Sequence, residues 1–401
     1  MYYDVIIIGA GISGLYTAYK IKNKYPEINF IILESNSKEY IGGRTRTELF
    51  YEHDIAPGAG ILKKDTDKLT IKLLKQLQIK FSESPSIIEY SNQFGEFLDV
   101  LKVIKILKKE YKKYSDKNAT FQKFGKEILG KELYNKFIES NIYDDFEHIS
   151  AEEVLYEYEF DKPGSINIYL NWGEVIHKLI KFIDIKNIRT STEIIKIKKL
   201  NDKFAVISKK GTKFFCNNIV MATTIESVQK LLHLPIYNEI HGSPCIRIYG
   251  KFDSNSSKIM AKYVKHFTIM PSVLHNIIPI SPSNGIYMIA YSDEEQAKYL
   301  RKYIDNTEDN CNILSELLKK SLGIKEDLKL IGIKGYYWKT SVHFYEPRNK
   351  KIYKTRDHFI YKAQHPKEGV YVVGECVSNR QGWVEGAISS VEKIFWKNGF
   401  L

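Results

Sequence analysis

The sequence predicts an α/β fold, and three observations carry that prediction. An apolar β-branched run at residues 5–8 leads directly into a glycine-rich turn at 9–14 and then into apolar helical spacing. Near the other end, a strand-like run is followed by a second glycine-containing turn that opens the last helix. Between them, Lys-rich amphipathic patterns give way to strand-like segments. We therefore expect a Rossmann-type domain and a second domain with a mixed sheet and a helical cap.

The length and composition of the chain limit the classes of protein to which it can belong. Its 401 residues are enough for about two or three domains. Because 43% of the residues are hydrophobic and 13% are aromatic, extended disorder is excluded. The net charge of +12 favours anionic partners, anionic surfaces or an anionic cofactor, and a solvated basic surface is the alternative.

The cysteines and the apolar runs indicate the cellular compartment. The four cysteines, at 216, 245, 311 and 376, form no CxxC pair, so neither a metal site nor a disulfide framework is indicated. The first residues lack a basic region and a cleavage motif. No apolar run reaches the roughly 18–20 residues that span a bilayer. The sequence therefore predicts an intracellular, cytoplasmic protein without a transmembrane segment.

The turn at 9–14 has the spacing of a dinucleotide-binding fingerprint. Gly9 permits the tight turn, Gly11 lets a pyrophosphate approach the backbone, and Gly14 lets the helix pack against the strand. The next strand ends at Glu34, where an acid binds the hydroxyl pair of a ribose. The cofactor-binding residues predicted here are Gly9, Gly11, Ser13, Gly14 and Glu34. The alternative is a glycine-rich turn in an unrelated α/β protein.

A second glycine-containing turn begins eight residues after Glu34. Gly42 and Gly43 offer bare backbone and Arg44 adds a guanidinium, so a second anionic group would fit here. A nicotinamide fingerprint does not require this turn. The two turns together therefore point to FAD, whose pyrophosphate and ribityl chain would run across them.

With these two turns the sequence resembles the flavin-containing amine oxidase superfamily, which includes monoamine and polyamine oxidases, protoporphyrinogen oxidases and related desaturases. In that family a GGRxxT motif follows the ribose-binding acid, and a segment close to D/E-x-G-A passes the flavin ring. The corresponding segment here is 53–60, in which Gly58 and Ala59 match and Ala56 stands where an acid is usual. The resemblance implies that Gly58 and Ala59 contact the cofactor.

The region from 62 to about 150 reads as Lys-rich amphipathic helices. In 101–109 the apolar residues share one face and the lysines the other, which favours the outer layer of a domain with a solvated basic face. A helix that binds an anionic or membrane surface is the alternative. The resemblance implies that this region is a cap over the substrate side of the flavin.

After this cap the chain returns to the cofactor pattern. The runs 188–197, 204–208 and 213–222 read as successive strands, and an ordinary β-meander is the alternative reading of any one of them. The resemblance implies that Ile194 lies beside the adenine. We expect a discontinuous FAD-binding domain at 1–62, 165–235 and 350–401. The substrate-binding domain would then comprise 63–164 and 236–349.

The C-terminal fingerprint consists of Gly374-Glu375 after a buried strand and the sequence GWVEGA at 382–387. A turn that opens a helix at this point suits the ribityl and pyrimidine end of a flavin. In the family, Glu375 would approach the ribityl and phosphate region, and the backbone of Trp383 and Val384 would reach a flavin carbonyl. The contacts implied at this end are Gly374, Glu375, Trp383, Val384 and Ala387.

The resemblance also implies the reaction. An amine loses hydride from its α-carbon to flavin N5, and oxygen reoxidises the flavin. Two aromatic rings usually guide the amine to the flavin, and Trp383 fits one of them by its motif. For the other we expect Tyr345, with Trp338 in reserve, from a stretch similar to W-x-x-A-x-P-x-Y in which His343 replaces the proline.

Many amine oxidases have a lysine near flavin N5, on a strand that corresponds to 245–251 here. No lysine can be placed there, so either Arg247 substitutes for it or oxygen reactivity is reduced. The loop that carries the cysteinyl flavin link in the family has no cysteine in this chain. We therefore expect non-covalent FAD, with Trp383, Tyr345 and Arg247 on the substrate side.

Three other readings stay open at this point. The chain could be a protoporphyrinogen oxidase-like or desaturase-like flavoenzyme, or a flavin-binding protein without catalysis. A specific nucleic-acid partner is not expected, because no known nucleic-acid-binding motif is present. A small amine is the expected substrate. If the substrate is a polyamine, the acids Glu157, Glu159 or Glu346 could bind it. The basic surface disfavours polycations.

Overall fold

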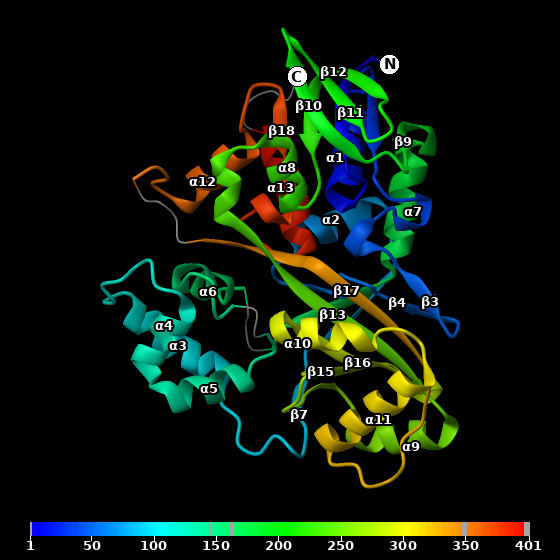
Figure 1. Ribbon diagram of the computed structural model, residues 1–401, viewed down its shortest axis with the longest axis vertical. Helices are drawn as coiled ribbons and strands as arrows, with labels where there is room; N and C mark the ends of the chain where they lie inside the picture. Colours follow the sequence, from blue (N-terminus) through cyan, green and yellow to red (C-terminus); the bar gives the residue numbers. More distant parts are fainter. Residues whose placement is uncertain (1, 144–145, 161–163, 347–350, 397–401) are drawn as a thin grey trace.

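The computed structural model describes residues 2–143, 146–160, 164–346 and 351–396. Figure 1 shows two large sheets, one above the other, with a group of helices beside the lower one. No helix in the described ranges is long and apolar enough to cross a membrane.

The upper sheet is a seven-stranded Rossmann-type sheet with a meander at one edge. Its strands in order are β10 (Ile194–Leu200), β11 (Lys203–Ser208), β12 (Lys213–Met221), β1 (Tyr2–Ile8), β2 (Phe30–Leu33) and β9 (Ile188–Arg189), and β18 (Val370–Val372) pairs with β12. β1 is parallel to both of its neighbours, whereas the meander is antiparallel. The prediction of one strand at 188–197 is wrong. The segment forms β9 and β10, which lie at opposite edges of the sheet, because the chain turns at Ser191 with a φ of +50°.

Helices cover both faces of this sheet because β1 is apolar on both sides. Val5 and Ile7 pack against α1 (Ile12–Lys24), α7 (Trp172–Ile183) and α13 (Val384–Trp396), with α2 (Lys68–Gln76) behind them. Ile6 and Ile8 face a second core with α8 (Ile225–Leu232) and α12 (Arg356–Gln364). A strand buried on both faces explains the continuous β-branched run at 5–8.

The lower sheet is mixed, as expected. Its order is β17 (Leu330–Tyr345), β13 (Ile240–Phe252), β16 (Ile286–Asp293), β15 (Asn276–Ser281), β14 (Phe267–Ile269) and β7 (Ile88–Tyr90). All pairs are antiparallel except β14 with β7. One face packs against α9 (Ser254–Tyr263), α10 (Glu294–Leu300) and α11 (Glu308–Leu322).

Small sheets join the two large ones. They are the hairpin of β3 (Glu48–Phe50) with β4 (His53–Ile55), and the sheet of β5 (Ile61–Lys63), β8 (Ile166–Leu170) and β6 (Phe81–Pro85). The long strands β13 and β17 also link the two regions, because Ile240 and Tyr345 at their ends belong to the core of the upper sheet. The domain boundaries given above stay a prediction.

The cap is a separate helical cluster, visible at the left of Figure 1. It consists of α3 (Val100–Tyr111), α4 (Phe121–Leu129), α5 (Lys131–Glu139) and α6 (Ala151–Glu157), which enclose their own apolar core. On α3, Val103, Ile104 and Leu107 are buried, whereas Lys102 and Lys105 are exposed. The basic face of this helix is therefore part of the surface.

Candidate functional site

The turn between β1 and α1 leaves open backbone at one glycine only. Gly9 has a φ of +107°, and a Cβ on it would collide with the carbonyl oxygen of Ala222. A Cβ on Gly14 would collide with the carbonyl oxygen of Gly9. A Cβ on Gly11, at the start of α1, would meet no atom within 4 Å. Gly9 and Gly14 are thus needed for packing, whereas Gly11 leaves room for a phosphate at a helix N-terminus. Ser13 is buried in the first turn of α1.

Glu34 lies at the end of β2 and faces this turn. Its Oε2 accepts a hydrogen bond from the backbone N–H of Ala10 at 2.8 Å, and its Oε1 accepts one from Asn36 at 2.8 Å. The backbone N–H of Thr192 bonds to the carbonyl oxygen of Glu34 at 2.8 Å. This contact brings the segment before β10 next to Glu34, at the end of β2. Ile194 itself is buried in the apolar core. Its predicted contact with an adenine stays a prediction.

The second glycine turn lies directly against the first. The N–H of Gly42 donates to the carbonyl oxygen of Ala10 at 2.9 Å, and Gly43 approaches Gly11. Segment 58–59 is the next layer, because Ala59 donates its N–H to the carbonyl oxygen of Arg44 at 2.7 Å. A Cβ on Gly58 would collide with that same oxygen. The structure therefore gathers all three predicted N-terminal segments in one place.

The two ends of the chain meet through a buried ionic group. Nη1 of Arg44 lies 2.9 Å from Oε1 of Glu375, and Nδ1 of His343 contacts the same oxygen. The N–H of Gly382 donates to Oε2 of Glu375 at 2.9 Å. Burial by itself would raise the pKa of Glu375, but the charges of His343 and Arg44 and these hydrogen bonds hold it at about 2. Glu375 is thus a fixed anion that orients Arg44 and the start of the last turn.

Sequence reasoning missed the part that His343 plays here. It noted this residue only as a substitute for the family proline. His343 lies on β17, is buried, and reaches a carboxylate 32 positions further along the chain. No local pattern connects the two residues.

Trp383 is half-buried at the start of α13, and two cations lie over its ring. The Nζ of Lys63 is 5.0 Å and the guanidinium carbon of Arg380 is 4.8 Å from the ring centroid. Arg380 also forms an ion pair with Asp67 at 2.9 Å. Burial, aided by the charge of Arg380, lowers the pKa of Lys63 to about 8. No local sequence pattern connects Lys63 and Arg380 with Trp383. Val384 and Ala387, which follow in α13, are buried.

Arg247 lies on β13 against the segment that corresponds to D/E-x-G-A. Its Nη1 donates to the carbonyl oxygen of Ala56 at 3.2 Å and lies close to Gly60. The hydroxyl of Tyr249 donates to the same oxygen at 2.7 Å, and the ring of Tyr291 lies 4.8 Å from the guanidinium carbon. Trp338 also reaches this segment, since its Nε1 donates to the carbonyl oxygen of Pro57 at 2.7 Å.

The structure corrects the role expected for Tyr345. Its ring is fully buried, packs edge-on against Phe359, and belongs to the core of the upper sheet. Its hydroxyl donates to the carbonyl oxygen of Ser378 at 2.8 Å. A ring enclosed on all sides forms no wall of a substrate site. Trp338, half-buried beside segment 53–60, is the remaining candidate for the second aromatic wall.

The acids considered for a polyamine do not gather in one place. Glu346 pairs with Nε2 of His241 at 3.3 Å, and Glu159 is exposed. Oε1 of Glu157 lies 3.7 Å from Nη2 of Arg356, and burial raises the pKa of this carboxyl group to about 8. The structure thus offers no cluster of ionised acids for a polycation in the residues that it describes.

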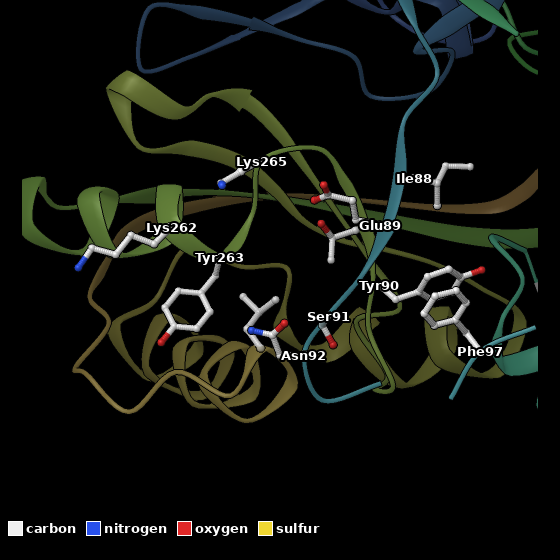
Figure 2. A pocket seen from close by; sticks show the side chains of 11 residues that line it. Ile88, Glu89, Tyr90, Ser91, Asn92, Phe97, Lys262, Tyr263 and Lys265 are labelled. Carbon is white, nitrogen blue, oxygen red and sulfur yellow. The ribbon is translucent and has the colours of Figure 1, made fainter. Parts of the chain in front are cut away.

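A surface pocket of about 530 Å³ lies at the far edge of the lower sheet. Figure 2 shows Lys262 and Tyr263 on one side of β7, and Tyr90 and Phe97 on the other. None of the predicted site residues lines it. It is therefore separate from the place where the glycine turns, Glu375 and Trp383 meet.

Comparisons with known proteins identify the family and the fold. The model of the family described as flavin containing amine oxidoreductase matches residues 12–391. An uncharacterized protein of Acanthamoeba polyphaga mimivirus is 20% identical over 98% of this chain and 93% of its own length.

Solved structures of putrescine oxidase share the fold. A single-residue mutant superimposes with a TM-score of 0.77 at 12% identity, and 98% of each chain is covered. The wild-type enzyme bound to putrescine gives a TM-score of 0.75 at 12% identity over the same share of both chains. The likeness in fold and the family match over nearly the whole length lead to one conclusion. The chain belongs to the family of flavin-containing amine oxidoreductases.

Proposed function

We propose that the protein is an FAD-dependent amine oxidase that binds its cofactor without a covalent link. The observation that carries this proposal is the meeting of Gly11, Gly43, Arg44 and Glu375, contributed by both ends of the chain, beside Glu34. These groups form a row that is longer than the binding of a mononucleotide would need. When bound, the flavin would take a hydride from the amine-bearing carbon of the substrate and pass the electrons on to oxygen.

Each group in the row has a distinct part in holding the cofactor. The open backbone at Gly11 and the N-terminus of α1 would receive the pyrophosphate. Arg44, held in place by Glu375, would supply the positive charge beside it. Glu34 would accept hydrogen bonds from the ribose hydroxyls, since its carboxylate already faces the turn.

The substrate side would be formed by residues of both regions. Trp383 would provide one aromatic wall and Trp338 a second, while Arg247 would place a positive charge at segment 56–60. The four cysteines are buried, and none lies in the loop that carries the covalent flavin link in the family, which supports a non-covalent cofactor. The intracellular location expected from the sequence stays a prediction.

The test uses the purified yellow protein in two steps. Acid precipitation should release the colour into the supernatant, and chromatography should identify FAD. Under anaerobic conditions, a panel of amines, amino acids and protoporphyrinogen should then be tested for bleaching of the flavin. We expect bleaching by an amine-bearing compound and peroxide formation when air is admitted. Bleaching by protoporphyrinogen alone would favour the alternative flavoenzyme, and a flavin that nothing bleaches would contradict an enzyme.

A further inference from the structure

We propose that Arg247 binds a carboxylate of the substrate, so that this protein acts on amines that carry an acidic group, such as 2-amino acids, in preference to diamines. This inference rests on the proposed function, because it concerns the substrate side of the same site. It commits the enzyme to a chemical class of substrate that differs from the diamine bound in the putrescine oxidase structure.

The first argument is the burial of Arg247. Arg247 lies deep in the molecule, and only part of the residue keeps accessible surface. Tyr291, which packs against it, has the same combination. Both side chains are therefore placed to contact a small molecule at segment 56–60.

The second argument is a comparison with the other largely buried arginines. Arg44 pairs with Glu375 at 2.9 Å, Arg356 with Glu153 at 2.7 Å, and Arg380 with Asp67 at 2.9 Å. In the ranges that the structure describes, no carboxylate forms an ion pair with Arg247, whose neighbours include the carbonyl oxygen of Ala56, two tyrosines and Cys245. Its buried Nε donates to no described residue.

A buried guanidinium without a counter-ion is costly. An unpaired buried charge is one of the most unfavourable groups in a protein interior, and an aromatic face compensates only part of that cost. A planar carboxylate from a ligand would supply both the opposite charge and the missing acceptor, in the geometry that arginine binds best. The fold thus retains a cation whose partner has to come from outside the described chain.

The third argument is the charge around the neighbouring wall. Segment 56–63 contacts Arg247 at Ala56 and Gly60, and through Lys63 it reaches the ring of Trp383. Arg380 lies over that ring as well. Asp67 pairs with Arg380, so Lys63 and Arg247 are the cations that a substrate would meet. A diamine would bring two positive charges towards them, whereas an amino acid brings a carboxylate along with its amine.

Matched pairs of compounds that differ only in the carboxylate provide the experiment. The holoenzyme is mixed anaerobically with L-ornithine or putrescine, with L-lysine or 1,5-diaminopentane, and with L-phenylalanine or phenethylamine. We expect the amino acid of each pair to bleach the flavin about 10- to 100-fold faster at low concentration, the range for one charge-assisted contact. Equal or faster bleaching by the amines that lack the carboxylate would overturn the inference.

Binding without turnover provides a second readout. The probe is 3-phenylpropionate, followed by its perturbation of the flavin absorbance, with the uncharged 3-phenylpropanamide as control. In Arg247→Met we expect binding of the acid to weaken about 10- to 100-fold and binding of the amide to stay unchanged. Arg247→Lys keeps the charge but loses the bidentate contact, so its affinity for the acid should lie between those of the wild type and Arg247→Met.

A matched control removes a different arginine of the same region. Arg301 is exposed and lies over the ring of Tyr337, far along the chain from the site. Arg301→Met should bind the acid like the wild type. Unchanged binding in Arg247→Met would overturn the inference. If no amine of either kind bleaches the flavin, the proposed function fails, while loss of acid binding in Arg247→Met would still support a carboxylate site there.

Discussion

The cofactor end and the substrate end of the candidate site are built in different ways. At the cofactor end, Arg44 and Glu375 form an ion pair that His343 also contacts, and the glycine turns interlock through backbone hydrogen bonds. At the substrate end, Arg380 pairs with Asp67 and lies with Lys63 over the ring of Trp383, whereas Arg247 has no acidic partner in the described residues. A closed ionic network suits a cofactor that never changes, whereas open charge suits a ligand that comes and goes.

The strongest test of this contrast removes the anion at the centre of the cofactor end. Glu375→Gln leaves Arg44 and His343 without their shared carboxylate. We expect a loss of about 3–5 kcal/mol of unfolding free energy, as for other buried pairs that lose one partner. Urea denaturation of the protein measures this loss. Glu174→Gln, which removes an exposed carboxylate on α7, should change the stability by less than about 1 kcal/mol.

A smaller loss is expected when the packing of the glycine turn is disturbed. In Gly14→Ala the new methyl group would collide with the backbone oxygen of Gly9, which cannot move without displacing β1. We expect a destabilisation of about 1–3 kcal/mol, typical of overpacking, and a lower midpoint of thermal unfolding. A variant as stable as the wild type would show that the turn accommodates a methyl group at position 14, which would contradict this prediction.

The neighbouring glycine separates packing from cofactor binding. A methyl group in Gly11→Ala meets no protein atom within 4 Å, so the fold should retain its stability without cofactor. The same methyl group would occupy the place of the phosphate, and we expect flavin affinity to fall about tenfold or more. Equilibrium titration of the cofactor-free protein with FAD measures the affinity. Unchanged affinity would move the phosphate away from Gly11.

The smallest effect is a pH dependence at the substrate end. Burial raises the pKa of Glu157 from 4.5 to about 8, so the folded protein keeps a proton that the unfolded chain releases. This contribution to stability is complete below about pH 4.5 and is lost as the pH rises to about 8. Glu157→Gln should therefore become the more stable of the two by a few degrees as the pH rises through this window. The exposed neighbour Glu159→Gln should follow the wild type.

The parts of the site that sequence alone predicts are those in which one short segment does the whole task. Gly14 packs against the carbonyl oxygen of Gly9 within one strand, turn and helix, and Gly9 itself packs against the distant Ala222, but the spacing of the two glycines identifies both. Glu34 follows from the end of the next strand. The family match, over residues 12–391, includes Gly14, Glu34 and the last turn.

What sequence reasoning missed depends on contacts between distant segments. Tyr345 and Trp338 lie on one strand, but β17 passes from the lower sheet into the core of the upper one, and no local pattern marks that crossing. His343 gains its role from a carboxylate 32 positions away. Arg247 could be found in the sequence, but the absence of an acidic partner among the described residues becomes evident only in three dimensions.

The shared strands also set how the molecule can deform. β17 has 16 residues and pairs with β13 along most of its length, so this ribbon extends for about 50 Å and is anchored in both cores. Bending the two sheets apart would break the ribbon's ladder of hydrogen bonds. We therefore expect the molecule to be rigid along this axis, with larger internal motions confined to the cap. A displacement at the substrate end would then be transmitted along β17 to His343 and the cofactor network with little loss of amplitude.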